Sequence, residues 1–357
     1  MAEDLFASAE PAWICKADPC ASDLITLLSS VRIRRNIEGF PFPFKCGKSE
    51  LYDSAAVILG SLGESSVLGD CDFRMIDSLD DASRHLLLEM NMITPRFAQG
   101  GPGRFLLRDA EGRVACMVNE EDHISISVTN PGLGVTSALN TVIDVERSLE
   151  VNLVRDAVLG YLTSNPVYVG TGMTATVMLH LPALYALDDM TRVADTFKRD
   201  WNSLELGRWL PFGDEPCGSF YSLSNRITLS VAPEDISRNV SQAAQALISR
   251  EMFARHKICC GKGVDVNDRF WRAWGLLRHA KKLTFPETMD AFSFVKLGSD
   301  VGVLPHIDDK EWRRLIVRCQ RYHLGAGSSV ILEENDEQFA RAAMFRQYIE
   351  GLSSSVN

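Results

Sequence analysis

The sequence predicts an α+β protein that ends in an all-helical region. Residues 25 to about 230 combine strand-like and helix-like patterns with frequent turns, whereas the residues after Pro233 show almost only helical periodicity. A chain of 357 residues with 46% hydrophobic composition can bury a large core and is long enough for two domains. We therefore expect an N-terminal extension (1–24), a mixed domain (25–232) and a helical C-terminal domain (233–357).

An antiparallel hairpin is predicted early in the mixed domain. Residues 105–118 contain two apolar runs around a central turn sequence. The acidic segment Asn-Glu-Glu-Asp-His at 119–123 follows directly. Beyond it, isoleucines and a valine alternate with Ser125 and Ser127, which predicts a strand with one apolar and one polar face. The side chain of Ser125 should therefore point away from the core.

A second informative strand follows a glycine turn. Gly170 and Gly172 bracket a tight turn with the sequence Gly-Thr-Gly. Because side chains alternate along a strand, the strand behind this turn should place four residues on one face. These residues are Thr174, Thr176, Met178 and His180.

The C-terminal domain should begin with an amphipathic helix at Pro233, since proline suits the first helical turn and the following acidic pair complements the positive helix end. A later helix is predicted from Thr284 and Glu287, which form a capping box, and Gly298 is placed to end it.

A basic cluster is predicted on a helix over residues 311–323. Arg314, Arg318 and Arg321 would share one face, close to Arg313. The pattern is typical of a solvated basic face, and it also suits an anionic partner such as a phosphorylated peptide.

Composition argues against several classes of protein. A net charge of −10 is unsuited to nonspecific nucleic-acid binding, because neutralising phosphates requires an excess of Lys and Arg. No stretch approaches the roughly 18 apolar residues that a membrane span needs. We expect a cytoplasmic protein whose partners include neither nucleic acid nor membrane.

The nine cysteines are odd in number and scattered, which is untypical of a disulfide framework and predicts reduced thiols. Cys15 and Cys20 have a spacing within reach of zinc, but no second Cys or His pair with metal-ligand spacing follows. No metal site is therefore expected.

Several short strings in a fixed order resemble the bacterial protein-arginine kinases, which belong to the ATP:guanidino phosphotransferases, or phosphagen kinases. The strings are the acidic segment, the Gly-Thr-Gly turn with residues 180–184, and segments 40–43, 160–163, 221–225 and 297–302. The resemblance covers most of the chain. It implies a phosphagen-kinase (glutamine-synthetase-like) domain with an antiparallel sheet of about eight strands flanked by helices, followed by a helical domain that helps to bind phosphoarginine and partners.

The chemistry that the resemblance implies is transfer of the terminal phosphoryl group of ATP to a guanidinium nitrogen. Carboxylates orient the guanidinium and accept a proton, while arginines and Mg²⁺ surround the polyphosphate. ATP and Mg²⁺ are therefore the implied cofactors. Because this catalysis consists mostly of positioning and charge stabilisation, the arginine cage is essential to it.

The implied carboxylates are only partly retained. By resemblance the base of the acidic segment is Glu121, with Glu120 and Asp122 as close support. The second carboxylate of the family lies in a flexible glycine-rich loop, where an ungapped comparison gives Phe212. Glu215 is nearby but out of register, and a shift of the loop could bring it into use.

The implied arginine strand, SSRxR in the family, reads Ser-Ser-Val-Arg at residues 29–32, so its first arginine is Ser30. Alternation along the strand places Arg34 on the same face as Arg32, which could preserve an arginine pair in a shifted register. With the adjacent Arg35, these are candidate nucleotide-binding residues.

Other implied arginine positions are substituted. By resemblance they fall at Ser125, Thr174 and Gly207, with Arg208 next to Gly207 as a possible substitute. Thr176 is a further substituted position of the implied site.

Three further positions differ from the residues that the resemblance implies. The adenine-side histidine of the family corresponds to Asn91, and its reactive cysteine before a proline corresponds to Asn165. The phosphoarginine-binding RDxxRA motif reads Glu-Gln-Phe-Ala-Arg-Ala at 337–342, so its first charge is inverted.

Two main functions remain open from the sequence, and a small-molecule phosphagen kinase is a third. The first is a protein-arginine-kinase-like protein with weak or no phosphotransfer, acting as a pseudokinase with a regulatory or binding role. The second is an active ATP-dependent protein-arginine kinase with a remodelled site that uses a different set of residues: Arg32, Arg34, Arg208, Glu121 and Glu215. Either one implies a protein substrate or partner protein, and the family suggests a homodimer.

Overall fold

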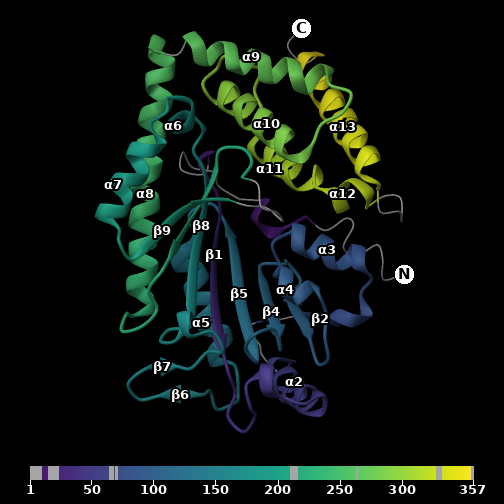
Figure 1. Ribbon diagram of the computed structural model, residues 1–357, viewed down its shortest axis with the longest axis vertical. Coiled ribbons are helices and arrows are strands. Elements are labelled where there is room, and N and C mark those ends of the chain that lie inside the picture. The colour runs from purple at the N-terminus through teal and green to yellow at the C-terminus, as the bar shows by residue number, and fades with distance from the viewer. Residues whose placement is uncertain are drawn as a thin grey trace.

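An eight-stranded antiparallel sheet with strand order β2-β3-β4-β5-β1-β8-β10-β9 forms the body of the molecule (Figure 1). The computed structural model describes residues 10–14, 24–63, 68, 71–209, 216–262, 264–326 and 332–354. The sheet confirms the predicted α+β fold. Its strands are β1 (Thr26–Arg35), β2 (Cys71–Met75), β3 (Phe105–Asp109), β4 (Val114–Val118), β5 (Ile124–Pro131), β8 (Met173–His180), β9 (Leu204–Arg208) and β10 (Phe220–Asn225).

One face of the sheet is buried under two helices, α5 (Val135–Arg147) and α8 (Pro233–Lys257). In β1, Val31 and Ile33 are directed to this face and are almost completely buried. Removing apolar surface from water contributes about 25 cal/mol per Å², so this layer supplies much of the stability of the fold. It also fixes the register that exposes the alternate residues of β1 on the other side.

The opposite face is covered at one edge by α3 (Asp81–Glu89) and α4 (Pro95–Ala98). Apolar residues of these helices form a separate buried cluster with the edge strands, including Phe97 and Met117. Met117 of β4 lies opposite Ser125 of β5. The apolar cluster therefore stops where the polar residues of the middle strands begin.

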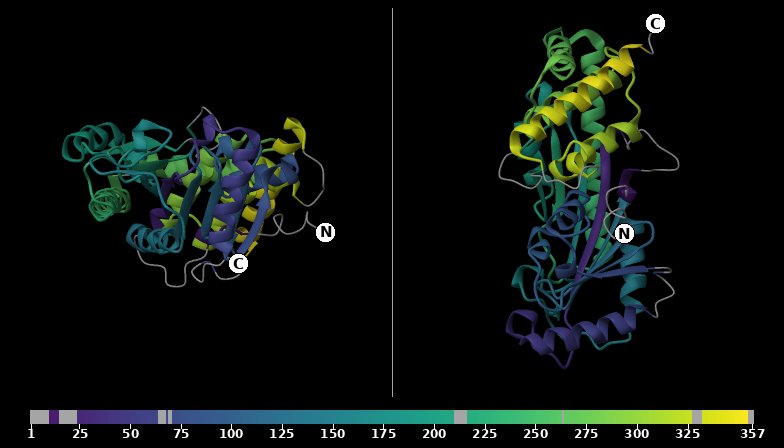
Figure 2. Two further views of the ribbon diagram at one scale, coloured as in Figure 1. Left: turned by 90° about the horizontal axis from the view of Figure 1, so that it is seen from below. Right: turned by 90° about the vertical axis from the view of Figure 1, so that its right-hand side faces the viewer.

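The C-terminal helices are stacked at one end of the sheet (Figures 1 and 2). They are α9 (Val264–His279), α10 (Phe285–Asp300), α11 (Asp309–Arg318), α12 (Arg321–Gly325) and α13 (Glu334–Ser354). A buried ionic cluster joins them to α8, because Arg255 pairs with Glu251 (3.0 Å) and with Asp300 of α10 (2.8 Å). Removing one partner would leave a buried charge uncompensated.

The remaining regular elements lie around the sheet. They are a 3-10 turn (Ala12–Ile14), α2 (Lys48–Gly63), β6 (Arg155–Asp156), β7 (Gly160–Tyr161), α6 (Pro182–Ala186), α7 (Met190–Asp200) and a π-helical turn (Ile258–Lys262), with further 3-10 turns. In the part of the chain that the structure describes, no helix combines the length and apolar character needed to cross a membrane. Helix α8 begins at Pro233 as predicted but packs on α5 and β8, and the domain division at residue 232 stays a prediction.

The predicted N-cap at Thr284 is confirmed, since its side chain accepts a hydrogen bond from the Glu287 amide (3.3 Å). The predicted end at Gly298 is wrong, because α10 continues to Asp300 and Gly302, at φ +77°, follows its end. Gly298 instead provides room for packing, because a Cβ there would lie 2.8 Å from Leu304 Cδ1.

The predicted helix over residues 311–323 is divided between α11 and α12, and its basic face is partly occupied from within the chain. Arg314 binds the carboxylate of Glu10 through two of its nitrogens, and Arg318 lies 3.9 Å from the same group. Buried Arg313 donates to the carbonyl of Trp13 (3.4 Å). These contacts seat the segment around Trp13 between the sheet and the helical region.

Candidate functional site

The open face of the middle strands carries hydroxyl groups around one arginine. Residues directly opposite each other on antiparallel strands point to the same side of a sheet. Arg32 of β1 lies opposite Thr174 of β8, and Ser30 lies opposite Thr176. Strand β10 extends the row, because Ser224 lies opposite Thr176. We define the hydroxyl face as the partly exposed members of this set: Ser30, Arg32, Thr174, Thr176, Ser222 and Ser224.

The guanidinium of Arg32 makes no hydrogen bond or ion pair with any residue that the structure describes. Burial, together with the neighbouring charge of Arg34, lowers the pKa of Arg32 to about 10, and the carboxylate of Glu120 acts in the opposite direction. A partly buried cation without a partner is costly to the fold. A bound anion would supply that partner, so Arg32 marks the candidate ligand site.

Arg34 shares the face of Arg32, as the alternation predicts, but it has partners within the protein. Its Nη1 donates to Thr174 Oγ1 (2.9 Å), and its Cζ lies 3.7 Å from the ring centroid of Tyr168. Ser125, directly opposite Arg34, is 1% exposed, and its hydroxyl has no hydrogen-bond partner among the described residues. The position where the resemblance implies an arginine therefore holds a small, enclosed side chain.

Arg35 and Arg208 were expected to be nucleotide-binding residues, but the strand register directs both away from the hydroxyl face. Arg35 points to the α5 side, where its Nε lies 2.5 Å from Glu146 Oε1 and its guanidinium covers the ring of Tyr161. Arg208 lies opposite Tyr221, whereas Gly207 lies opposite Ser222 of the hydroxyl face. Because adjacent strand residues point to opposite sides, neither arginine reaches the hydroxyl face.

The acidic segment lies in the loop between β4 and β5, with its first two carboxylates partly exposed. Glu120 accepts a hydrogen bond from the hydroxyl of Thr94. Glu121 accepts one from Arg96 Nη1 (2.5 Å), an exposed arginine whose side chain is 52% accessible. Both carboxylates remain at the surface, where they can take a cationic group from outside.

Asp122 has a structural position instead. It is 1% exposed, and its Oδ1 accepts hydrogen bonds from Asn36 Nδ2 (2.7 Å) and from the amide of Ser164 (2.6 Å). The adjacent His123 is buried, accepts from the amide of Ile37 (3.3 Å), and has its pKa lowered by burial to about 4. These two residues fix the acidic segment to the residues that directly follow β1, which orients the two glutamates.

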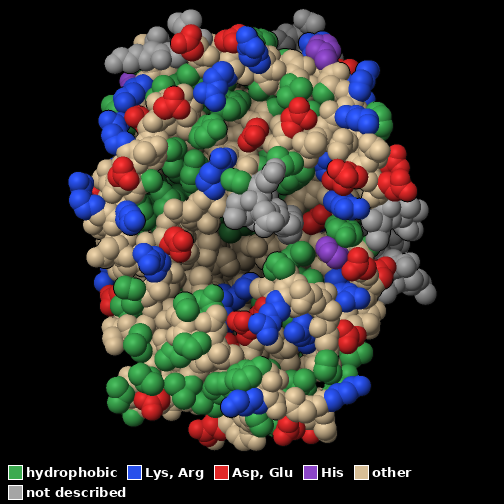
Figure 3. Space-filling view, viewed as in Figure 1, with side chains coloured by type: hydrophobic (Ala, Val, Ile, Leu, Met, Phe, Trp, Pro, Cys, Tyr) green, Lys and Arg blue, Asp and Glu red, His purple; other side chains and the backbone are tan. Residues whose placement is uncertain are grey.

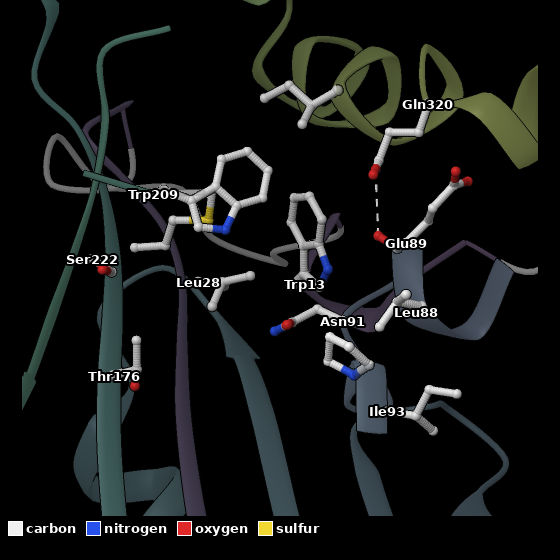
Figure 4. A pocket seen from close by; sticks show the side chains of 13 residues that line it. Trp13, Leu28, Leu88, Glu89, Asn91, Ile93, Thr176, Trp209, Ser222 and Gln320 are labelled. Atoms are coloured by element: carbon white, nitrogen blue, oxygen red, sulfur yellow. Dashed lines mark hydrogen bonds between the residues drawn. The ribbon is translucent and has the colours of Figure 1, made fainter. Parts of the chain in front are cut away.

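A cavity of about 280 Å³ opens beside the hydroxyl face, below the C-terminal helices (Figure 4). The molecular surface is hollowed in this region, and basic and acidic side chains gather at the lower edge of the hollow (Figure 3). The cavity is lined by Trp13, Leu28, Leu88, Glu89, Asn91, Ile93, Pro95, Thr176, Met178, Trp209, Ser222, Ile316 and Gln320. Thr176 and Ser222 belong to both features, so the cavity and the hydroxyl face form one continuous site.

Two further positions that the resemblance singles out, Asn91 and Asn165, have separate roles. Asn91 lines the cavity with a left-handed backbone (φ +62°), which asparagine tolerates better than most residues. Asn165 accepts a hydrogen bond from the amide of Val167 (3.1 Å) and so caps a short 3-10 turn. Its side chain is engaged in local structure.

Two predicted residues, Phe212 and Glu215, lie outside the described residues, as do Cys15 and Cys20. The seven cysteines that the structure describes are free thiols. In the same part of the chain, no group of three or more His, Cys, Asp or Glu side chains is placed to hold a metal ion.

The inverted motif of the helical region is engaged in internal contacts. Arg341 is 1% exposed and donates to the carbonyls of Cys319 (2.7 Å) and Leu283 (2.9 Å). Glu337 pairs with Arg341 and lies 3.7 Å from Arg321. The retained arginine of the motif therefore holds the helices together.

The cavity residues that were not predicted from the sequence include Trp13, Trp209 and Gln320. They come from the N-terminal segment, the end of β9 and the start of α12, and they meet only in the folded chain. Sequence periodicity could not predict that these residues line one cavity, because each of them lies in a different segment of the chain.

The fold is that of the guanidino phosphotransferases. The structure resembles the crystal structure of lombricine kinase with a TM-score of 0.55 and 18% identity, covering 73% of this chain and 72% of that one. It also resembles the substrate-free duplicated taurocyamine kinase from Schistosoma mansoni, with a TM-score of 0.57 and 18% identity, covering 72% of this chain and 40% of that one.

Sequence comparison identifies the family of the chain more closely than the fold does. Residues 62–254 match the family model of the ATP:guanido phosphotransferase C-terminal catalytic domain, and residues 263–357 match that of the protein-arginine kinase McsB C-terminal domain. The protein-arginine kinase of Geobacillus kaustophilus (strain HTA426) is 31% identical over 353 residues, covering 98% of this chain and 96% of that protein. That of Brevibacillus brevis is 31% identical over 338 residues, covering 92% of this chain and 93% of that protein. The chain belongs to the protein-arginine kinase family.

Proposed function

We propose that this member of the family performs weak or no phosphotransfer and acts as a regulatory, kinase-like binding protein. The observation that carries the proposal is the hydroxyl face, where Arg32 is the guanidinium without a partner among the described residues. The positions where the resemblance implies further arginines hold Ser30, Ser125 and Thr174. Serine and threonine suit the strands and leave the fold intact while they remove positive charge.

The charge balance supports this function. Phosphoryl transfer to a guanidinium depends on stabilising charge on the transferred group, and one transition-state arginine can be worth about 10³ to 10⁵ in rate. A hydroxyl can donate a hydrogen bond to a phosphate oxygen, but it brings no positive charge to offset that of the phosphate, as a guanidinium does. A triphosphate with Mg²⁺ would therefore be held weakly here, and its terminal group would lack the electrostatic stabilisation that the reaction needs.

An active kinase with a remodelled site is the second candidate. The observation that favours it is the position of Arg34 on the same face as Arg32, with Glu120 close enough to act on the charge of Arg32. In that case Glu121 would accept the guanidinium proton, with Glu215 as the second carboxylate. For both candidate functions we also propose a protein substrate or partner protein, a cytoplasmic location and a homodimer.

The test combines binding and activity on the full chain. Mg-ATP is titrated by calorimetry into the wild type, Arg32→Ala and the surface control Arg147→Ala, and transfer of labelled phosphate from ATP to arginine residues of an unfolded protein is measured in parallel. Undetectable arginine phosphorylation, with Mg-ATP binding no tighter than millimolar, is the expected result. Arginine phosphorylation that Arg32→Ala abolishes and Arg147→Ala preserves would overturn the proposal in favour of the active kinase.

A further inference from the structure

A groove of about 410 Å³ lies between α7 and the second half of α8, and we call it the α7–α8 groove. Both helices lie along one side of the molecule (Figure 1). Helix α8 packs on the face of the sheet that is opposite the hydroxyl face. A partner in this groove would therefore leave the hydroxyl face free.

The floor of the α7–α8 groove is apolar. Leu184, Val193 and Ala254 line it and are each at most 3% exposed. Phe253 stands beside this floor and is 61% exposed. A single exposed aromatic residue is ordinary on a protein surface, but one that adjoins a recessed apolar floor is typical of an interaction site.

The walls of the groove carry an excess of positive charge. Three cations line it, Arg192, Arg250 and Lys257, against the single carboxylate of Asp189. Asp189 lies 2.9 Å from Arg192 Nη2 and 3.8 Å from Lys257 Nζ, so its charge is shared between two cations. Arg250 makes no hydrogen bond or ion pair with any residue that the structure describes. In a chain with a net charge of −10, this local excess is complementary to an acidic partner.

The length of the groove suits a helix. Its walls are residues 189–196 at the start of α7 and residues 249–257 at the end of α8, and each wall spans about two helical turns, or about 11 Å. The contact between Asp189 and Lys257 marks one end, so Arg250, about two turns away along α8, lies toward the other. An amphipathic helix presents its apolar side chains over the same two turns, at i, i+3 or i+4, and i+7.

The shape of the groove favours a protein segment over a membrane surface. The apolar floor is recessed, so a flat bilayer could reach the exposed ring of Phe253 but not the buried side chains behind it. Figure 3 shows carboxylates among the Lys and Arg side chains over α7 and α8, whereas binding to anionic lipids favours a uniformly basic surface.

We propose that the α7–α8 groove docks an amphipathic acidic helix of a partner protein. The apolar side chains of that helix lie on the floor and against Phe253, and its carboxylates pair with Arg250 at one end and with Arg192 and Lys257 at the other. The inference goes beyond the proposed function, because the groove is separated by the sheet from the hydroxyl face and its occupation does not depend on phosphotransfer.

The experiment is fluorescence anisotropy of a labelled amphipathic peptide titrated with the full chain. The peptide has about four helical turns, with leucine and phenylalanine along one face and glutamate on both flanks. Two matched peptides carry glutamine in place of every glutamate, or alanine in place of every leucine and phenylalanine. The first peptide should bind at least tenfold more tightly than either matched peptide. Its affinity should fall at least threefold when the salt concentration is raised from about 50 to 300 mM.

Variants of the groove locate the binding. Arg250→Glu and Phe253→Ser should each weaken binding of the acidic peptide at least tenfold, and thermal melting checks that both variants fold. The matched controls are Arg147→Glu, at an exposed position on α5, and Phe44→Ser. Phe44 is 62% exposed and, like Phe253, has a lysine near its ring. Both controls should bind the peptide as the wild type does.

Three results would overturn the inference: equal affinity for the three peptides, unchanged binding by Arg250→Glu and Phe253→Ser, or no anisotropy change at millimolar protein. Sedimentation with phosphatidylglycerol vesicles that Arg250→Glu prevents, without peptide binding, would replace the partner helix by a membrane surface. All of these results leave the proposed function standing, because that function is tested by Mg-ATP binding and arginine phosphorylation. Detectable phosphorylation would in turn leave the groove assignment standing.

Discussion

Arg32 of β1 and Thr174 of β8 lie directly opposite each other on the open face of the sheet, and the threonine hydroxyl binds the neighbouring Arg34. Within the family resemblance, the threonine stands where an arginine is implied. Thr174 accepts a hydrogen bond from Arg34 and brings no positive charge to the face that it shares with Arg32. Four expectations follow from this and related contacts.

Replacing Thr174 by arginine should return charge to the site. The new guanidinium would lie opposite Arg32, so we expect the free energy of unfolding to fall by about 1 kcal/mol, because like charges directly opposite on strands repel. Mg-ATP affinity should rise at least tenfold, since a charge-assisted hydrogen bond contributes about 1.5 to 3 kcal/mol. Calorimetry measures the affinity, with Thr191→Arg on the exposed side of α7 as the control. Equal affinity in both variants would contradict the assignment of this face.

Arg32 and Arg35 should respond oppositely to replacement by methionine. Arg35→Met removes one member of a mostly buried pair with Glu146, whose side chain is 14% exposed, and should cost about 3 to 5 kcal/mol of unfolding free energy. Arg32→Met removes an unpartnered, partly buried cation, and stability should remain equal or increase. Urea denaturation measures both. Comparable destabilisation by the two variants would show that Arg32 is a structural residue.

The acidic segment should divide into one structural and one surface carboxylate. Asp122→Ala leaves the partly buried Ser164 amide without an acceptor and leaves Asn36 Nδ2 only the carbonyl of Leu162, which should cost about 2 to 3 kcal/mol. Glu121→Ala removes an exposed pair with Arg96, for which about 0.5 kcal/mol is expected. Urea denaturation of the two variants is the measurement, and a larger effect at Glu121 would refute the division.

Stability should fall on acidification because His123 is buried and neutral. Burial lowers the pKa of His123 to about 4, below the ordinary value near 6.5, so the unfolded chain binds the proton more readily. The contribution of His123 is fully present above about pH 6.5 and is lost progressively as the pH falls toward 4, by up to roughly 3 kcal/mol.

The matching measurement is the pH dependence of urea denaturation between pH 7 and 4 in His123→Asn, which keeps an acceptor for the Ile37 amide. This variant should show a shallower decline than the wild type. The exposed control His279→Asn should follow the wild-type curve. Identical slopes in all three proteins would mean that His123 does not titrate differently in the folded state.

The expectations for Arg34 and Arg208 show what a strand pattern can decide. Alternation placed Arg34 beside Arg32, and the register confirms this position. Ser125 lies on the same face, but it is 1% exposed and lies opposite Met117 of a buried apolar cluster, so the expectation that it points away from the core is wrong. Arg208 is next to Gly207 in the sequence, but neighbouring residues of a strand do not share a face, so it cannot take the place of an arginine at position 207.

By itself, the sequence determined the α+β class, the start of α8 at Pro233, the hairpin before the acidic segment, and the family, because these depend on local periodicity, capping and ordered motifs. Only the tertiary structure decided that Trp13 and Gln320 share a cavity, that Glu10 pairs with Arg314, and that Asp122 is fixed by Asn36. Such contacts join residues far apart in the chain. Their existence depends on how helices and strands pack against one another, and local side-chain spacing carries no record of that packing.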